Sequence, residues 1–170
     1  MKILIGFVVI LLTVQAHATQ IDFRDLTNLV SDADHVLVGT VTQVDMIDGK
    51  GNQVTNETAR TGPGIENMLR LHVSVATNGV MVSSASKAPE TLVIPLWQKW
   101  HDTLGNRKKE VQGKTFIFLL KGKDFAPVYQ GGFWRNLSDR PEIEAILKKK
   151  RSQNQASQAI GAPGAPQPER

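Results

Sequence analysis

The sequence contains no cysteine. This absence excludes disulfide bonds, thiol catalysis, cysteine-ligated zinc and a lipid anchor attached through a cysteine. The fold must therefore rest on its hydrophobic core, which a chain of 170 residues can supply. Long apolar runs are also missing after Val14, and about 20 apolar residues are needed to cross a bilayer.

The first 18 residues have the three parts of a secretory signal peptide. Lys2 supplies the positive start, Ile3–Val14 is an apolar run, and Ala16-His17-Ala18 is a small-x-small cleavage site. We therefore predict export, with cleavage near Ala18 and a mature chain in the periplasm or outside the cell. A retained N-terminal anchor is the alternative, but the run is too short to span a bilayer comfortably.

The remainder is predicted to form a single domain, residues 19–151, followed by a tail. Residues 152–170 are rich in alanine, proline and glutamine. Such a composition cannot bury a core, so we expect this tail to be disordered.

Two helices are expected, one near each end of the domain. The first ends at about Ser31 behind a cap at Asp22. Its apolar positions are Phe23, Leu26, Leu29 and Val30. The second begins at a capping box formed by Asp139 and Glu142. Its apolar stripe consists of Ile143, Ile146 and Leu147.

A basic run, Lys148–Arg151, follows this apolar stripe. We place it at the C-terminus of the second helix, where cations interact favourably with the helix dipole. Binding to a membrane or a nucleic acid is the alternative explanation. Since the dipole accounts for the run, we predict no nucleic-acid partner.

Segments rich in β-branched residues predict about five strands. They lie at residues 35–44, 69–75, 91–97, 114–120 and 125–129. Gly39 indicates a bulge, and Asn78-Gly79 indicates a hairpin turn. Pro95 cannot donate a ladder hydrogen bond, so it places its strand at a sheet edge. Residues 48–64 and 99–112 are expected to be loops.

These elements predict a mainly β, α+β fold. We expect an OB-like five-stranded barrel, closed or nearly closed, with a short N-terminal helix and a C-terminal helix.

Two stretches carry a family resemblance, residues 31–41 (SDADHVLVGTV) and 113–119 (GKTFIFL). They resemble secreted bacterial OB-fold proteins similar to the superfamily of tissue inhibitors of metalloproteinases and netrin modules. The resemblance covers residues 25–135 and consists mostly of core hydrophobic residues, so it implies a fold. The inhibitors of that superfamily chelate a protease zinc through an N-terminal cysteine. The mature chain would begin at Thr19 and has no cysteine, which excludes that mechanism.

Gly113-Lys114-Thr115 matches the end of a phosphate-binding loop. Lys108 stands where that loop needs a glycine, and a strand-like segment follows in place of a helix. We therefore interpret Lys114-Thr115 as the polar start of a central strand.

No catalytic, metal or cofactor site is predicted. His35, His72 and His101 remain after signal cleavage, and their spacing does not match a helical metal motif. Asp45 and Asp48 suggest an oxygen-ligand calcium loop, but their spacing fits no EF-hand, and a plain turn is favoured.

The three tryptophans lie in two short segments, 97–101 and 133–135. Trp97 and Trp134 either close the barrel ends as core residues or lie at the surface as binding anchors. The core position is favoured, because large aromatic side chains are mostly buried. Trp100, beside two polar residues, is the better candidate for exposure. The predicted ligand-binding residues are Lys99, Trp100, His101 and Arg135.

Two functions remain open. The first is a noncatalytic exported module that binds an extracytoplasmic protein or a polar ligand. The second is a hydrolase whose site is assembled from dispersed polar residues. The absence of a catalytic signature such as G-x-S-x-G favours the first.

Overall fold

The computed structural model describes residues 24–98 and 100–160, with side chains described up to Gln155. The elements, in chain order, are α1 (Leu26–Asp32), β1 (His35–Ile47), β2 (Arg60–Thr61), β3 (Met68–Ser83), β4 (Thr91–Pro95), β5 (Asp102–Thr103), α2 (Leu104–Val111), β6 (Thr115–Lys121), β7 (Ala126–Pro127), β8 (Trp134–Arg135), the 3-10 turn η1 (Leu137–Asp139) and α3 (Arg140–Ile160).

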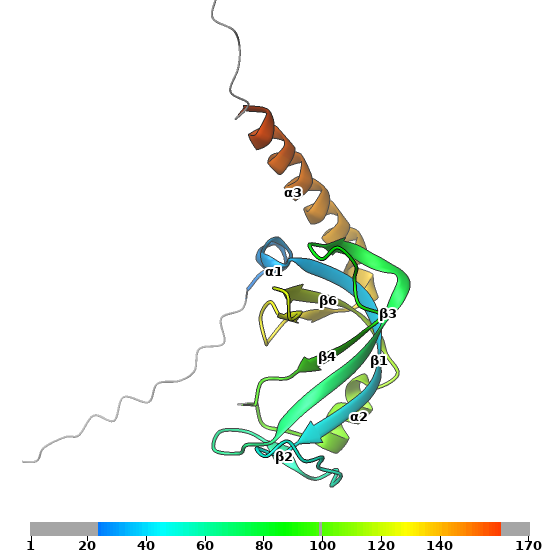
Figure 1. The fold of residues 1–170 in the computed structure, drawn as a ribbon, viewed down its shortest axis with the longest axis vertical. Helices are drawn as coiled ribbons and strands as arrows, with labels where there is room; N and C mark the ends of the chain where they lie inside the picture. Colours follow the sequence, from blue (N-terminus) through cyan, green and yellow to red (C-terminus); the bar gives the residue numbers. More distant parts are fainter. Residues whose placement is uncertain (1–23, 99, 161–170) are drawn as a thin grey trace, which may run out of the picture.

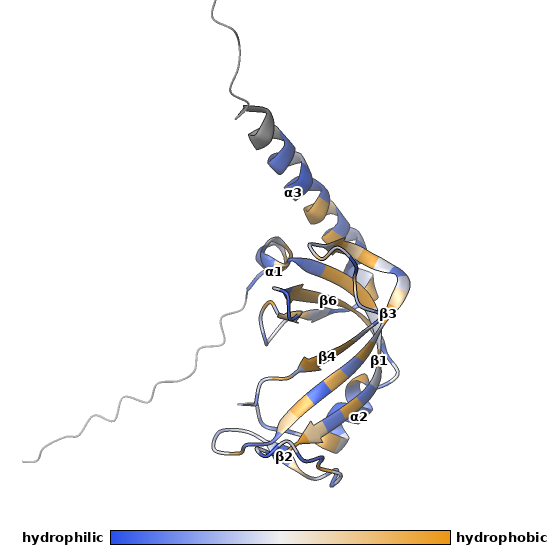
Figure 2. Cartoon of the chain, in the orientation of Figure 1, coloured by the Kyte–Doolittle hydropathy of each residue, from blue (hydrophilic) through white to orange (hydrophobic). Residues whose placement is uncertain are grey.

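The main sheet is antiparallel and strongly curved (Figure 1). Its strands follow the order β4-β3-β1-β6-β7, and β8 also pairs with β6. β2 and β5 form a separate pair. β1 and β6 occupy the centre because consecutive residues of β6 and of the first half of β1 are mostly apolar and buried; the apolar colouring of β6 is visible in Figure 2.

The curved sheet separates two hydrophobic clusters. The first lies on the inner face, where Leu37, Leu71 and Phe118 are fully buried. The second lies between the opposite face and the helices α1 and α3, with Ile117 and Ile143 at its centre. Alternate residues of β1 and β6 therefore enter different clusters, as the period of a strand requires.

The predicted mainly β, α+β class is confirmed, but the sheet does not close into a barrel. Within residues 24–98 and 100–160, no strand ladder joins β4 to β7 or β8. The edge position predicted for Pro95 is confirmed, since β4 pairs with β3 alone. Leu96 N donates to Leu69 O, and Glu90 O accepts from Val75 N, so the residues on this alternation bond to β3. Pro95, one position away from Leu96, has its missing N–H on the unpaired edge, where it costs no ladder bond.

The loop predicted at residues 99–112 is wrong, because this segment contains the helix α2. Thr103 caps it, with its hydroxyl accepting from Asn106 N at 3.2 Å. Leu104 and Val111 bury its apolar side. Leu104 and Val111 are the only large apolar residues of α2. Because polar and charged residues separate them, the sequence shows no apolar periodicity from which the helix could be predicted.

The hairpin predicted at Asn78-Gly79 is also wrong, since β3 continues through both residues to Ser83. A Cβ at Gly79 would lie 2.5 Å from Val38 O, so glycine is needed here for close strand contact and not for a turn. The irregularity predicted at Gly39 is confirmed, because the β1–β3 register shifts beside it.

The tail predicted from residue 152 onwards begins as a helix in the structure. α3 continues to Ile160, so residues 152–160 are helical, and the expected disorder of this part of the tail is wrong. Glutamine and alanine are adequate helix formers, and here they extend a helix that is already nucleated by packing. Residues 161–170 and the predicted signal peptide lie outside the described residues.

Candidate functional site

A pocket of 340 Å³ lies where the curved sheet remains open. One wall comes from the segment that follows β4, and the opposite wall comes from residues 130–135, which include β8. Helix α2 supplies a third, polar wall. We call this the tryptophan pocket because all three tryptophans of the chain border it, Trp97, Trp100 and Trp134.

Two of these tryptophans are largely exposed. Trp97 has a relative exposure of 39% and Trp100 of 41%. Their ring centroids are 6.4 Å apart with an interplanar angle of 56°, so the two rings form an angled pair. The expected core position of Trp97 is therefore wrong. β4 ends at Pro95, two residues before Trp97, and this places the side chain outside the sheet.

Trp134 is half-buried and packs on the inner core. Its ring centroid is 4.7 Å from that of Phe133 and 6.3 Å from that of Phe116. The core position expected for Trp134 is thus correct for the side that packs on Phe133 and Phe116. The other side of the residue borders the pocket.

The polar wall is an ion-paired group on and beside α2. Arg107 Nε donates to Asp102 Oδ2 at 2.7 Å, and Arg107 Nη1 lies 2.8 Å from Glu110 Oε2. The guanidinium carbon lies 5.4 Å from the ring centroid of Trp134, a cation–π contact. Asp102 and Arg107 are each 14% exposed at the side chain, so this wall is held in a defined geometry.

A buried hydroxyl holds the segment that carries Trp100. Thr61 is 2% exposed, and its Oγ1 donates to Trp100 O at 2.6 Å. The same segment is anchored by the pairing of β2 with β5, where Thr61 faces Asp102. The backbone that carries the exposed ring of Trp100 is therefore held in place.

The structure separates the predicted binding residues. Trp100 and Arg135 both border the tryptophan pocket, whereas His101 is exposed and is not among its lining residues. His101 lies against Gly62, at which a Cβ would come within 2.6 Å of Nδ1. Lys99 lies outside the described residues.

Arg135 sits at the border of two environments. It pairs with Ile117, whereas Trp134 pairs with Phe118, so strand alternation places Arg135 on the face that carries α1 and α3. Its Nε is buried, and no described residue is hydrogen-bonded to it. Arg107, whose guanidinium lies over the ring of Trp134, is a further cation of the pocket and was not among the predicted binding residues. The Asp102-Thr103 capping signal before α2 could have identified that helix.

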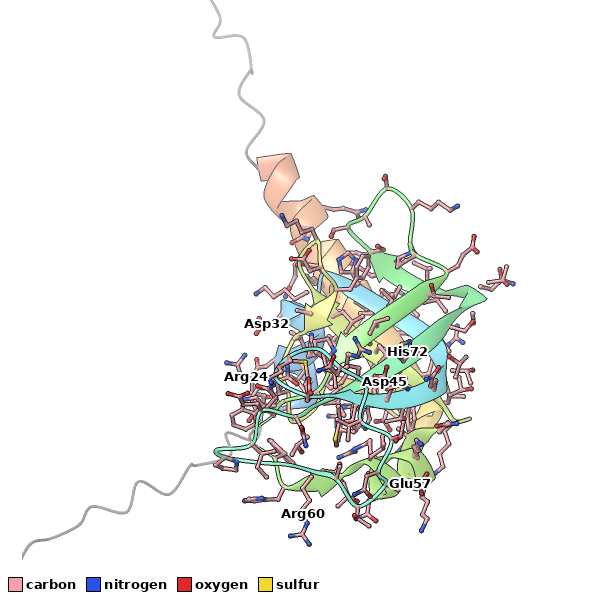
Figure 3. All side chains as sticks on the ribbon, turned by 60° about the horizontal axis from the view of Figure 1, so that its bottom comes forward. Arg24, Asp32, Asp45, Glu57, Arg60 and His72 are labelled. Atoms are coloured by element: carbon pink, nitrogen blue, oxygen red, sulfur yellow. The ribbon has the colours of Figure 1, made fainter. Side chains whose placement is uncertain are left out.

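A second polar cluster, Asp45, Arg70 and His72, lies on the outer face of the sheet (Figure 3). Arg70 Nε donates to Asp45 Oδ1 at 2.9 Å, and Arg70 Nη2 to Asp45 Oδ2 at 2.5 Å. His72 Nε2 lies 3.0 Å from Asp45 Oδ2, within ion-pair distance but without good hydrogen-bond geometry. Arg70 is the main cause that holds the pKa of Asp45 below its usual value, and His72 adds to it against the opposing effect of burial.

This cluster does not form a nucleophilic site. Among the described residues, no hydroxyl is hydrogen-bonded to the His72 ring, and Arg70 engages both oxygens of Asp45. A catalytic dyad needs a nucleophile within reach of its base. The cluster instead joins β1 to β3, where Asp45 and Arg70 are register partners.

The remaining candidates have structural roles. His35 is 1% exposed, and its ring nitrogens lie 2.9 Å from Ser83 Oγ and 3.0 Å from Gly122 O. Asp48 forms a turn by accepting from Lys50 N and Asn52 N, both at 2.8 Å. Within the described part of the chain, no group of three His, Asp or Glu side chains is placed to hold a metal ion.

No protein-family model matches this chain, and a search of curated proteins gave no match either. Within residues 24–98 and 100–160, no helix has both the length and the hydrophobicity needed to cross a membrane.

Proposed function

We propose that the protein is a noncatalytic, exported binding module whose tryptophan pocket receives a partner or ligand. The observation that carries this proposal is the pair Trp97 and Trp100, each more than a third exposed at a 340 Å³ pocket. Export rests on the signal peptide predicted at residues 1–18.

Exposed tryptophan pairs favour binding for a physical reason. A tryptophan buries a large apolar area on contact, and its two side-chain torsions cost little conformational entropy when it is fixed. The rings of Trp97 and Trp100 are inclined to each other, so one apolar group of a ligand can contact both rings. Such residues dominate the free energy of many interfaces.

The polar wall defines the complementary part of the ligand. Arg107 pairs with both Asp102 and Glu110, so the wall presents both donors and acceptors and carries one negative charge in excess. Glu110 remains 60% exposed at its side chain and offers acceptor oxygens at the rim. The pocket therefore suits a ligand with an apolar face and hydrogen-bonding groups at its edge.

The resemblance to secreted OB-fold proteins concerns the fold of the proposed module. We propose that the curved sheet is an OB-like barrel left open between β4 and β7, and that the opening is the binding position. The absence of cysteine excludes zinc chelation through an N-terminal thiol.

Fluorine NMR tests this proposal directly, because the three tryptophans of the chain all border the pocket. The protein is labelled with 5-fluorotryptophan and titrated with size fractions of an extracytoplasmic extract. Individual Trp→Phe variants assign the three resonances. We expect an active fraction to shift the resonances of Trp97 and Trp100 most. A fraction that binds the protein but leaves all three resonances unchanged would contradict the proposed site.

Intact-mass analysis tests the export component separately. The extracytoplasmic protein should begin at Thr19. A full-length chain retained in the cytoplasm would contradict export without bearing on the pocket.

A further inference from the structure

The basic run of α3 is not at the end of its helix. Lys148–Arg151 lie in the middle of a 21-residue helix, and residues 152–160 continue it beyond the body of the protein (Figure 1). The helix dipole acts only within the first or last turn. The dipole explanation for this run is therefore wrong, and another reason is needed for four consecutive cations.

Two of the four cations hold the helix on its neighbours, one on α1 and one on β3. Lys150 Nζ donates to Ser31 O at 2.6 Å, near the C-terminus of α1, and Arg151 Nη2 donates to Met81 O at 3.1 Å. These bonds satisfy carbonyl groups that would otherwise face water. Lys148 and Lys149 are exposed, and within the described part of the chain no such contact accounts for them.

Lys148 borders a groove of 280 Å³ between the end of β3 and α3. We call it the α3 groove, and its cations are Arg140, Lys148 and Arg151. Their spacing along α3 places them on one helix face. The one carboxylate of the groove, Glu144, is paired with Arg140 at 2.8 Å. The groove thus carries two positive charges in excess.

The floor of the groove is apolar. Leu147 is buried, and Val80 is 44% exposed at the rim. Cationic side chains around a partly apolar groove attract an anion more strongly than fully solvated cations do, because water screens their charges less in the groove. Lys148 supplies a mobile ammonium group, and Arg151 supplies guanidinium donors in a fixed position.

We propose that the α3 groove binds a phosphate group. Two sources have this chemistry, a soluble phosphate ester and the headgroup of an anionic phospholipid. The site is independent of the tryptophan pocket, since the two share no lining residue.

The test compares two lysines that are neighbours in sequence. Lys148→Glu changes a groove residue, and Lys149→Glu makes the same change in net charge at an exposed residue outside the groove lining. Each protein is titrated with glycerol phosphate, with vesicles of phosphatidylcholine, and with vesicles that also contain phosphatidylglycerol. Amide shifts of Val80 and Met81 report soluble binding, and co-sedimentation reports vesicle binding.

We expect Lys148→Glu to weaken phosphate binding roughly tenfold, as loss of a charge-assisted contact does, and Lys149→Glu to weaken it less than about threefold. This pattern with glycerol phosphate identifies a soluble ester as the ligand. The same pattern only with phosphatidylglycerol vesicles identifies a lipid headgroup. Equal weakening by both substitutions would show nonspecific attraction and overturn the site. Absence of wild-type binding to every probe would overturn it as well.

Discussion

Ile143 and Ile146 lie on the same helix but differ in burial, which makes them a matched test of how α3 holds the domain together. Ile143 is 0% exposed in the cluster between the sheet and α3, whereas Ile146 is half-buried at its border. Truncating Ile143 to alanine removes buried methyl groups and leaves a cavity, which we expect to cost about 3–4 kcal/mol of unfolding free energy. Truncating Ile146 should cost about 1–2 kcal/mol, because part of its surface already contacts water.

Urea unfolding followed by circular dichroism measures both variants. We expect the slope m to stay constant and the midpoint to fall further for Ile143→Ala than for Ile146→Ala. Equal losses, or a larger loss for Ile146→Ala, would refute the packing of α3 described above. Loss of cooperativity in the wild type would prevent two-state analysis and would itself contradict a single packed domain.

Three further predictions follow from the structure. Asp45→Asn should cost about 1–3 kcal/mol at pH 7 through the bonds to Arg70. Because folding lowers the pKa of Asp45, the stability that its carboxylate contributes is fully present above the unfolded pKa of 3.8 and is lost as the pH falls through the folded pKa. A stability difference between wild type and Asp45→Asn that stays constant down to pH 2 would contradict the Asp45–Arg70 ion pair. Gly39→Ala should cost about 1–3 kcal/mol, since its Cβ would meet Val73 Cγ1 at 2.6 Å, and an unchanged midpoint would show that the strands can separate there. Truncation after Arg151 should lower the helical signal but leave the melting temperature nearly unchanged, and unfolding on truncation would show that the projecting helix contacts the body.

The sequence predicted the elements whose apolar pattern is long and regular. β1 and β6 consist of β-branched and aromatic residues over many positions, and the stripe of α3 begins with Ile143 and Leu147, both buried. The same reasoning failed for α2, whose apolar signal is limited to Leu104 and Val111. It failed at Gly79 because a glycine that permits close strand contact has the same local pattern as one that permits a turn.

The site was predicted in part. Trp100 was selected for its position past a strand, and the structure places it at the tryptophan pocket. The contribution of Trp134 could not be predicted, because it depends on the pairing of β8 with β6 far from Trp100 in sequence. Arg107 was missed for the same reason as α2. Long-range pairing, and not local pattern, assembles this pocket.

The central claim is that the tryptophan pocket binds the partner or ligand of this protein. Its most direct test is capture from an extracytoplasmic extract, with species identified by mass spectrometry, using Trp97→Ala/Trp100→Ala and Val93→Ala variants. Val93 is 51% exposed on β4 but does not border the pocket, so it controls for loss of an exposed apolar residue. Both variants must first be shown to melt at similar temperatures. We then expect Val93→Ala to retain the species bound by the wild type and the double tryptophan variant to lose it. Retention of the same species by the double tryptophan variant would contradict the claim.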